Sequence, residues 1–150
     1  MPWRPSTDGM TSFSVKQPVS NLILSNVARV GVVSMAKTLS RQVAGEGITV
    51  NNVCPGYVLT DRLRNLAASN ARTENKTPEE IIAGWESSIP AGRLGRPEEL
   101  AALIAFLASE RAAYITGTTI QVDGGLLQSL SWLAQNGFPG PGESPLTWPF

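Results

Sequence analysis

The residues with the plainest chemical potential in this chain lie in one loop that follows a short apolar segment. Residues 48–53 are rich in β-branched side chains, and they lead into Cys54, Pro55 and Gly56, with Thr60 a few positions further on. A β-strand that stops at a proline leaves its carboxyl end open, which is where ligands bind in parallel α/β sheets. Gly56 allows a ligand to approach the backbone closely, and Thr60 offers a hydroxyl. The loop therefore predicts one wall of a ligand site.

The composition excludes several kinds of chemistry. The 150 residues include no histidine, so a Ser-His-Asp or Cys-His arrangement cannot form within this chain. Because the commonest metal ligand is also missing, we expect no metal site. Cys54 is the only cysteine, which rules out an internal disulfide. With no base nearby, we interpret it as a small buried hydrophobe rather than a reactive thiol.

Charge and hydropathy argue against two classes of partner. The chain has 12 basic and 12 acidic residues and a net charge of zero, so nothing favours nucleic acid or an anionic membrane. No apolar run approaches the ~20 residues that span a bilayer. The N-terminus lacks the apolar core of a signal peptide. We therefore expect a cytoplasmic protein with no nucleic-acid or membrane partner.

The first elements that must position the loop are a strand and a long helix. Residues 1–10 are polar and rich in turn formers, which predicts a disordered leader, and residues 10–14 resemble a short strand. Apolar residues at helical spacing predict a helix over residues 18–43, which Gly45 and Gly47 would end. The strand that precedes Pro55 follows after a very short connection.

The second half of the chain carries two helix starts and a further strand. A capping box at Thr77-Pro78-Glu79-Glu80 begins one helix, and Arg96-Pro97-Glu98-Glu99 begins another. Residues 118–122 alternate as a strand, whereas residues 130–150 form a Pro/Gly-rich tail that we expect to be disordered. Helices that alternate with strands predict an α/β domain with a parallel sheet over residues 11–129, although three strands leave a bare edge.

Five segments of the chain together form a recognisable pattern. They are Lys37-Thr38-Leu39, Gly47 to Val53, Pro55-Gly56 with Thr60, Arg93 to Glu99, and Ile115-Thr116-Gly117 through Val122-Asp123-Gly124-Gly125. In this order and at this spacing, they closely resemble the C-terminal half of the short-chain dehydrogenase/reductase family, of the 3-oxoacyl-acyl-carrier-protein reductase type. The resemblance covers about residues 10–129. It implies the C-terminal portion of a doubly wound, Rossmann-type parallel sheet that binds NADP or NAD.

The resemblance assigns cofactor-binding roles, with one part of the family pattern missing. In the family, the loop after the Pro-Gly strand contacts the nicotinamide end of the cofactor, which assigns Pro55, Gly56 and Thr60 to that role. The glycine-rich turn that binds the pyrophosphate does not occur in this sequence. The cofactor site is therefore expected to be incomplete in this chain, and the choice between NAD and NADP stays open.

The catalytic Tyr-x-x-x-Lys of the family is also altered. Counting back from Lys37-Thr38-Leu39 places Ser25 at the tyrosine and Arg29 at the lysine, and their i, i+4 spacing puts both on one helical face. Arg29 could hold the ribose hydroxyls, but it cannot relay a proton because it stays protonated. Thirteen residues before Ser25, Ser12 occupies the position of the family's carbonyl-binding serine, with Ser14 as a competitor.

Two further side chains could be considered as catalytic residues. Tyr57 is a conceivable substitute for the missing tyrosine, although packing or lining the substrate side is the favoured interpretation. Lys37 lies two helical turns beyond Arg29, and we interpret it as a solvated surface charge.

Two functional hypotheses follow. The first is an NAD(P)H-dependent oxidoreductase that reduces a 3-oxoacyl-thioester-like carbonyl, with Ser12, Ser25 and Arg29 as catalytic residues and with Arg29, Pro55, Gly56 and Thr60 at the cofactor. The second is a truncated, non-catalytic fragment that associates with intact family members. A small-molecule carbonyl or acyl-thioester substrate and homo-oligomerisation are the partners that the resemblance implies. Substrate specificity would lie in residues 60–93, which show helix propensity and little else.

Overall fold

A parallel sheet forms the centre of the molecule. The computed structural model describes residues 6–19 and 22–128. Its strands are β1 (Ser6–Met10), β2 (Thr49–Pro55) and β3 (Thr119–Val122), all parallel and in the order β1-β2-β3. The predicted α/β class and the parallel sheet are confirmed.

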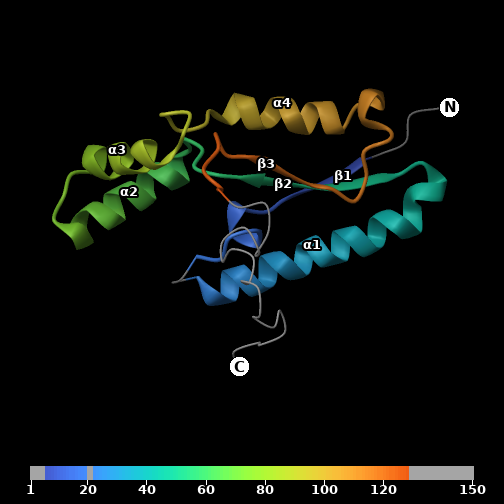
Figure 1. Cartoon of the computed structure of the whole chain (residues 1–150), viewed down its shortest axis with the longest axis horizontal. Helices are drawn as coiled ribbons and strands as arrows, with labels where there is room; N and C mark the ends of the chain where they lie inside the picture. The colour runs from blue at the N-terminus through green and yellow to red at the C-terminus, as the bar shows by residue number, and fades with distance from the viewer. Residues whose placement is uncertain (1–5, 20–21, 129–150) are drawn as a thin grey trace, which may run out of the picture.

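Helices cover both faces of this sheet (Figure 1). The long helix α1 (Ile23–Val43) packs along one face and contacts β2, and α4 (Pro97–Leu107) covers the opposite face. Helix α1 ends where the sequence predicts, and a short 3-10 turn, η2 (Ala44–Glu46), follows it. Gly47 then adopts φ 75°, a left-handed conformation that favours glycine, and returns the chain to β2.

The N-terminal prediction is wrong for the described part of the leader. Residues 6–10 form β1, paired in parallel with β2 from Ser6↔Thr49 to Met10↔Val53. The strand that we expected at residues 10–14 is instead a connection with a 3-10 turn, η1 (Phe13–Val15). The polar residues of β1 have weak strand propensity, and pairing with the buried β2 overrides it. Residues 1–5 and the predicted disordered tail at 130–150 lie outside the described residues.

The main core lies between the sheet and α4. Val53, Leu100, Leu107 and Ala112 are buried together there, the last of them in the 3-10 turn η3 (Glu110–Ala112). Between β2 and β3, Asn51 is fully buried, and its amide donates to the Ile115 carbonyl at 3.0 Å. This bond fixes the connection that leads into β3.

Helices α2 (Asp61–Glu74) and α3 (Pro78–Ser88) form a hairpin with a small core of its own, in which Ala67, Ala71 and Ile81 are buried. The predicted capping box at the start of α3 is confirmed, because Thr77 and Glu80 exchange both of its hydrogen bonds. Figure 1 shows the hairpin beyond the carboxyl ends of the strands, away from the α1–sheet–α4 layers.

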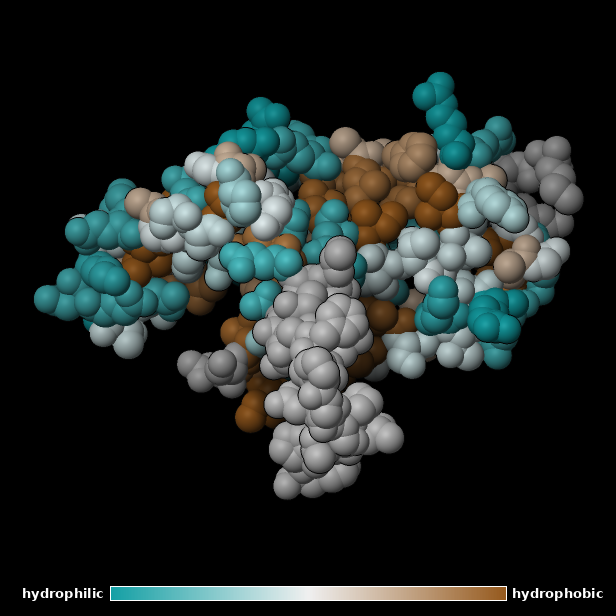
Figure 2. Space-filling view, viewed as in Figure 1, coloured by the Kyte–Doolittle hydropathy of each residue, from teal (hydrophilic) through white to brown (hydrophobic). Residues whose placement is uncertain are grey.

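Apolar side chains remain on the surface of both covering helices. Figure 2 shows hydrophobic residues over α4, and Phe106 is 41% exposed there. The outer face of α1, defined by Ile23, Leu24, Val27, Val30 and Met35, is more exposed still, and Leu24 reaches 86%. Within the described ranges, no helix is both long and apolar enough to cross a membrane.

Candidate functional site

The carboxyl ends of β1 and β2 bring the predicted site residues to one edge of the sheet. Ser12 follows β1 by two residues, and Pro55 is the last residue of β2. The two strand ends are joined where the Thr11 amide donates to the Val53 carbonyl at 2.9 Å. The loop that carries Ser12 therefore lies beside the loop that begins at Pro55.

Arg29 connects α1 to this edge. Its Nε donates to Ser25 Oγ at 3.0 Å, as the i, i+4 spacing allows, and its Nη1 donates to the Thr11 carbonyl at 2.9 Å. Thr11 immediately precedes Ser12, so Arg29 holds Ser25 close to the turn in which Ser12 lies. These contacts bring the three predicted catalytic residues, Ser12, Ser25 and Arg29, into one neighbourhood.

Among the residues that the structure describes, the Ser12 hydroxyl accepts one hydrogen bond and donates none. Its backbone is extended and its Oγ accepts from the Ser14 amide at 3.3 Å, so the side chain caps η1 and retains its own O–H donor. Ser14, the competing position, is only 2% exposed. Ser12 is therefore the more accessible of the two hydroxyls.

The loop after β2 is built around a contact that the sequence interpretation did not include. The Gly56 amide donates to the Val122 carbonyl at 3.0 Å, and a Cβ at Gly56 would lie 2.8 Å from the Asp123 Cβ. The absent side chain thus makes room for the end of β3, a packing role for Gly56. Thr60 is the N-cap of α2, and its Oγ1 accepts from the Leu63 amide at 3.4 Å. Its hydroxyl donates to no other described residue, and Thr60 is exposed.

Tyr57 lies in an aromatic cluster that the sequence did not predict. Its ring stacks on Trp85 of α3, with centroids 5.2 Å apart and planes 9° apart, and it meets Phe13 at 5.8 Å. No hydrogen bond is assigned to its hydroxyl within the described residues. The favoured interpretation of Tyr57 as a packing residue agrees with this geometry. No local spacing links these three positions, so no sequence signal could have found the cluster.

Cys54 and Lys37 both make contacts that hold the fold together. Cys54 is fully buried, as predicted, with its Sγ 3.0 Å from Thr11 Oγ1. Lys37 is exposed, but its Nζ donates to the Gly117 carbonyl at 2.9 Å, far along α1 from Ser25. Lys37 therefore ties α1 to the connection before β3 and stays apart from the site.

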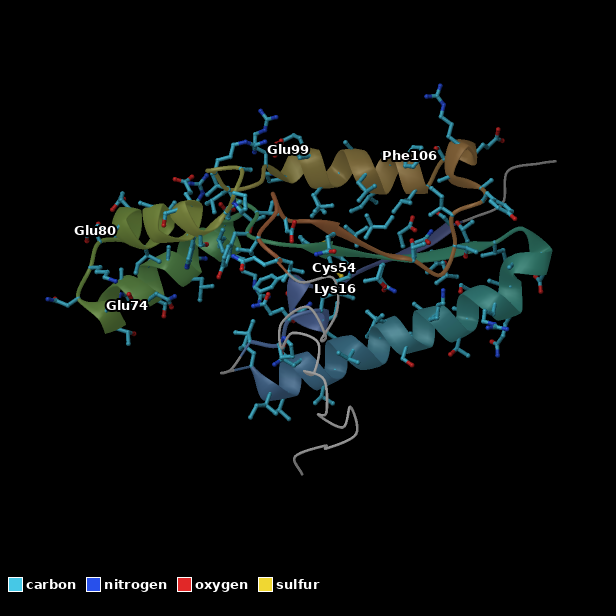
Figure 3. All side chains as sticks on the ribbon, viewed as in Figure 1. Lys16, Cys54, Glu74, Glu80, Glu99 and Phe106 are labelled. Atoms are coloured by element: carbon cyan, nitrogen blue, oxygen red, sulfur yellow. The ribbon has the colours of Figure 1, made fainter. Side chains whose placement is uncertain are left out.

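A cluster of charged side chains lies at the start of α4, in a segment that the sequence analysis used as a helix start and as part of the family resemblance. The Arg93 guanidinium donates two hydrogen bonds to Glu99, from Nη1 to Oε2 at 2.8 Å and from Nη2 to Oε1 at 2.6 Å. The Arg96 amide also donates to Oε2, at 2.8 Å. The Arg93 hydrogen bonds, helped by the Arg96 amide, lower the pKa of Glu99 to about 2. Figure 3 labels Glu99 at this end of the helix. Within the part of the chain that the structure describes, no group of three or more acidic or cysteine side chains is placed to hold a metal.

The chain is similar to known reductases. A family model described as enoyl-(acyl carrier protein) reductase matches residues 6–127. The chain is 48% identical over 102 residues to the 3-oxoacyl-[acyl-carrier-protein] reductase of Haemophilus influenzae, a match that covers 68% of this chain and 38% of that protein. It is 40% identical over 119 residues to the NADPH-dependent reductase BacG of Bacillus subtilis, covering 77% of this chain and 44% of that one.

The structure has matching relatives as well. A short-chain dehydrogenase family protein from Francisella tularensis superposes with a TM-score of 0.78 at 31% identity, over 81% of this chain and 50% of that one. The chain thus spans about half of this solved relative and less than half of the two curated relatives.

Proposed function

Because this chain belongs to the short-chain dehydrogenase/reductase family, we propose that the carboxyl edge of its sheet serves the NAD(P)H-dependent reduction of a carbonyl, with a 3-oxoacyl thioester as substrate class. The observation that carries the proposal is the pair of bonds from Arg29, to Ser25 Oγ and to the Thr11 carbonyl. They gather two hydroxyls and one positive charge at the strand ends, where a carbonyl oxygen could be received.

The residues present fit one end of the cofactor. Arg29 uses Nε and one Nη1 hydrogen within the protein, which leaves further guanidinium N–H groups for the ribose of the nicotinamide. Within the described residues, the Thr60 hydroxyl acts only as an acceptor, in the cap of α2, which leaves its proton for the cofactor. Pro55 and Gly56 shape the loop between these donors. When bound, the nicotinamide would supply the hydride.

The chain's own residues would act on the carbonyl oxygen. The Ser12 and Ser25 hydroxyls would each donate a hydrogen bond to it, and Arg29 would stabilise the negative charge that develops there. Ser25 is a much weaker acid than a tyrosine phenol, and proton transfer is typically worth about 10²–10⁴-fold in rate. We expect turnover to be slower by a factor in that range than with a tyrosine at this position.

The binding test uses the full chain with NADPH and NADH, followed by fluorescence. Arg29→Met should weaken NADPH binding by about tenfold or more, because it removes charge-assisted hydrogen bonds. Lys37→Met is the matched control, since it removes a cation from the same helix away from the site. The proposal fails if NADPH does not bind, or if both variants weaken binding equally while circular dichroism shows intact folding.

The chemical test follows NADPH oxidation with a 3-oxoacyl thioester. Ser25→Tyr combined with Arg29→Lys should raise the rate towards the 10²–10⁴-fold benefit of proton transfer. A double variant that binds NADPH but turns over no faster than the parent would remove Ser25 and Arg29 from the proposed roles.

A non-catalytic role in association is the second candidate, and the outer face of α1 favours it. Leu24 and Val27 are 86% and 69% exposed, and α1 carries no acidic residue. Such a face fits a second copy of the chain or an intact relative. Sedimentation should show a dimer that Leu24→Lys dissociates. A parent chain that sediments as a monomer would exclude self-association.

A further inference from the structure

We propose that a cavity at the ends of β2 and β3, beside the start of α4, binds a small carboxylate that carries a compact apolar group. The cavity has a volume of about 160 Å³, and its lining includes none of Ser12, Ser25 and Arg29. Tyr57 and Val58 lie in the same loop as Gly56 and Thr60, but the cavity lacks the residues assigned to the carbonyl, so ligand binding in it can be tested without turnover.

The walls of the cavity are apolar and the rim is charged. Tyr57 and Val58 of the loop after β2 line it together with Val122 at the end of β3. Arg93 and Arg96 line it from the loop before α4. An occupant would place an apolar body against the first three residues and a polar group near the guanidinium groups. Its volume is below the ~300–1,000 Å³ of drug-sized sites, so the occupant must be small.

The carboxylate oxygens around the cavity already accept hydrogen bonds. Both oxygens of Glu99 accept from Arg93, and Oε2 also accepts from the Arg96 amide. The two oxygens of Asp123 accept from the amides of Gly125, at 3.0 Å, and Leu127, at 3.1 Å. A ligand that offers only hydrogen-bond donors would have to compete with these existing bonds.

Donors, in contrast, are in surplus. Within the described residues, the Arg96 side chain makes one hydrogen bond, from Nη2 to Glu99 at 3.5 Å, the limit of a hydrogen bond, and it is 70% exposed. A guanidinium has five N–H donors in a planar fork that matches a carboxylate. The cavity therefore favours a ligand with acceptor oxygens, and its apolar walls favour one with a hydrophobic body.

The test titrates the full ¹⁵N-labelled chain with benzoate, with its neutral isostere benzamide and with inorganic phosphate. The amide signals of Gly95 and Gly124 report on the cavity, and Gly117, before β3, serves as the distant reference. We expect benzoate to shift the first two signals with an affinity at least about fivefold above that of benzamide and of phosphate. Added salt should weaken benzoate binding.

Two variants test whether the charge of Arg96 contributes to binding in the cavity. Arg96→Met keeps an apolar stem and should weaken benzoate binding about fivefold or more, whereas Arg111→Met, in η3 beyond the far end of α4, should leave it unchanged. Equal affinity for benzoate and benzamide overturns the proposal, and so does equal affinity for phosphate. The ligand comparison needs no variant, so it decides the matter even if Arg96→Met fails to fold.

Discussion

Two adjacent asparagines in β2 allow a sharp test of what holds the sheet together. Asn51 is 0% exposed and Asn52 is 2% exposed, and they point to opposite faces of the sheet. The Asn51 side chain makes three hydrogen bonds: to the Ile115 carbonyl, and from the Thr118 amide and hydroxyl. The Asn52 Oδ1 is buried with no partner within the described residues.

The expected difference follows from these bonds. Each of the three bonds is worth about 0.5–1.5 kcal/mol, so Asn51→Ala should lower the free energy of unfolding by roughly 1.5–4.5 kcal/mol. Asn52→Ala removes an oxygen that is desolvated without compensation, so its effect should stay within about 1 kcal/mol of zero. Both substitutions delete the same atoms from buried positions, and the difference between them therefore isolates the hydrogen bonds.

Urea unfolding followed by far-UV circular dichroism measures both values. Thr118→Val provides an internal check, because it removes only one of the three bonds and should cost about 1 kcal/mol. The reasoning is refuted if Asn51→Ala and Asn52→Ala lower stability equally. A larger loss from Asn52→Ala would mean that its oxygen has a partner in solution.

Further predictions concern Glu99 and two glycines. Because the pKa of Glu99 lies at about 2 and not at its ordinary 4.5, its contribution to stability is present above pH 4.5 and is lost as the pH falls towards 2. Glu99→Gln should therefore flatten the acid dependence of unfolding over that range, and an unchanged acid limb would contradict the role of Arg93. Gly56→Ala should destabilise the fold and broaden the amide signal of Asp123, since the new Cβ would lie 2.8 Å from the Asp123 Cβ. Gly84→Ala, inside α3 with open space around it, should raise the free energy of unfolding by about 0.5–1 kcal/mol, and both glycine variants are read by urea unfolding.

The sequence predicts elements best where their signals are local. The capping box of Thr77 and Glu80, and the glycine that follows α1, satisfy backbone groups within a few residues, so their spacing alone indicates a helix end. Strand β1 has no such signal. Its residues become a strand only because β2 offers a parallel partner more than forty positions later, and a turn-rich composition hides that pairing.

The candidate site divides in the same way. The bond between Arg29 and Ser25 follows from i, i+4 spacing on one helix, and the sequence anticipates it. The bond from Arg29 to Thr11 depends on how α1 lies against β2 and η1, so only the fold reveals it. The stacking of Tyr57 on Trp85 joins residues that are far apart in sequence and share no spacing, and it could not be anticipated.

The contacts of Arg29 also bear on which steps of the proposed function Ser25 could support. In the proposed function, Arg29 donates to the Ser25 oxygen, which occupies an acceptor and leaves the serine proton directed elsewhere. A neighbouring positive charge makes a hydroxyl a better hydrogen-bond donor, but it does not bring a serine into the acidity range of a phenol. In the proposed function, the geometry that would receive a carbonyl oxygen is therefore present without a group that readily protonates it. For this reason, binding of NADPH and turnover must be measured separately, because only turnover depends on the residue at position 25.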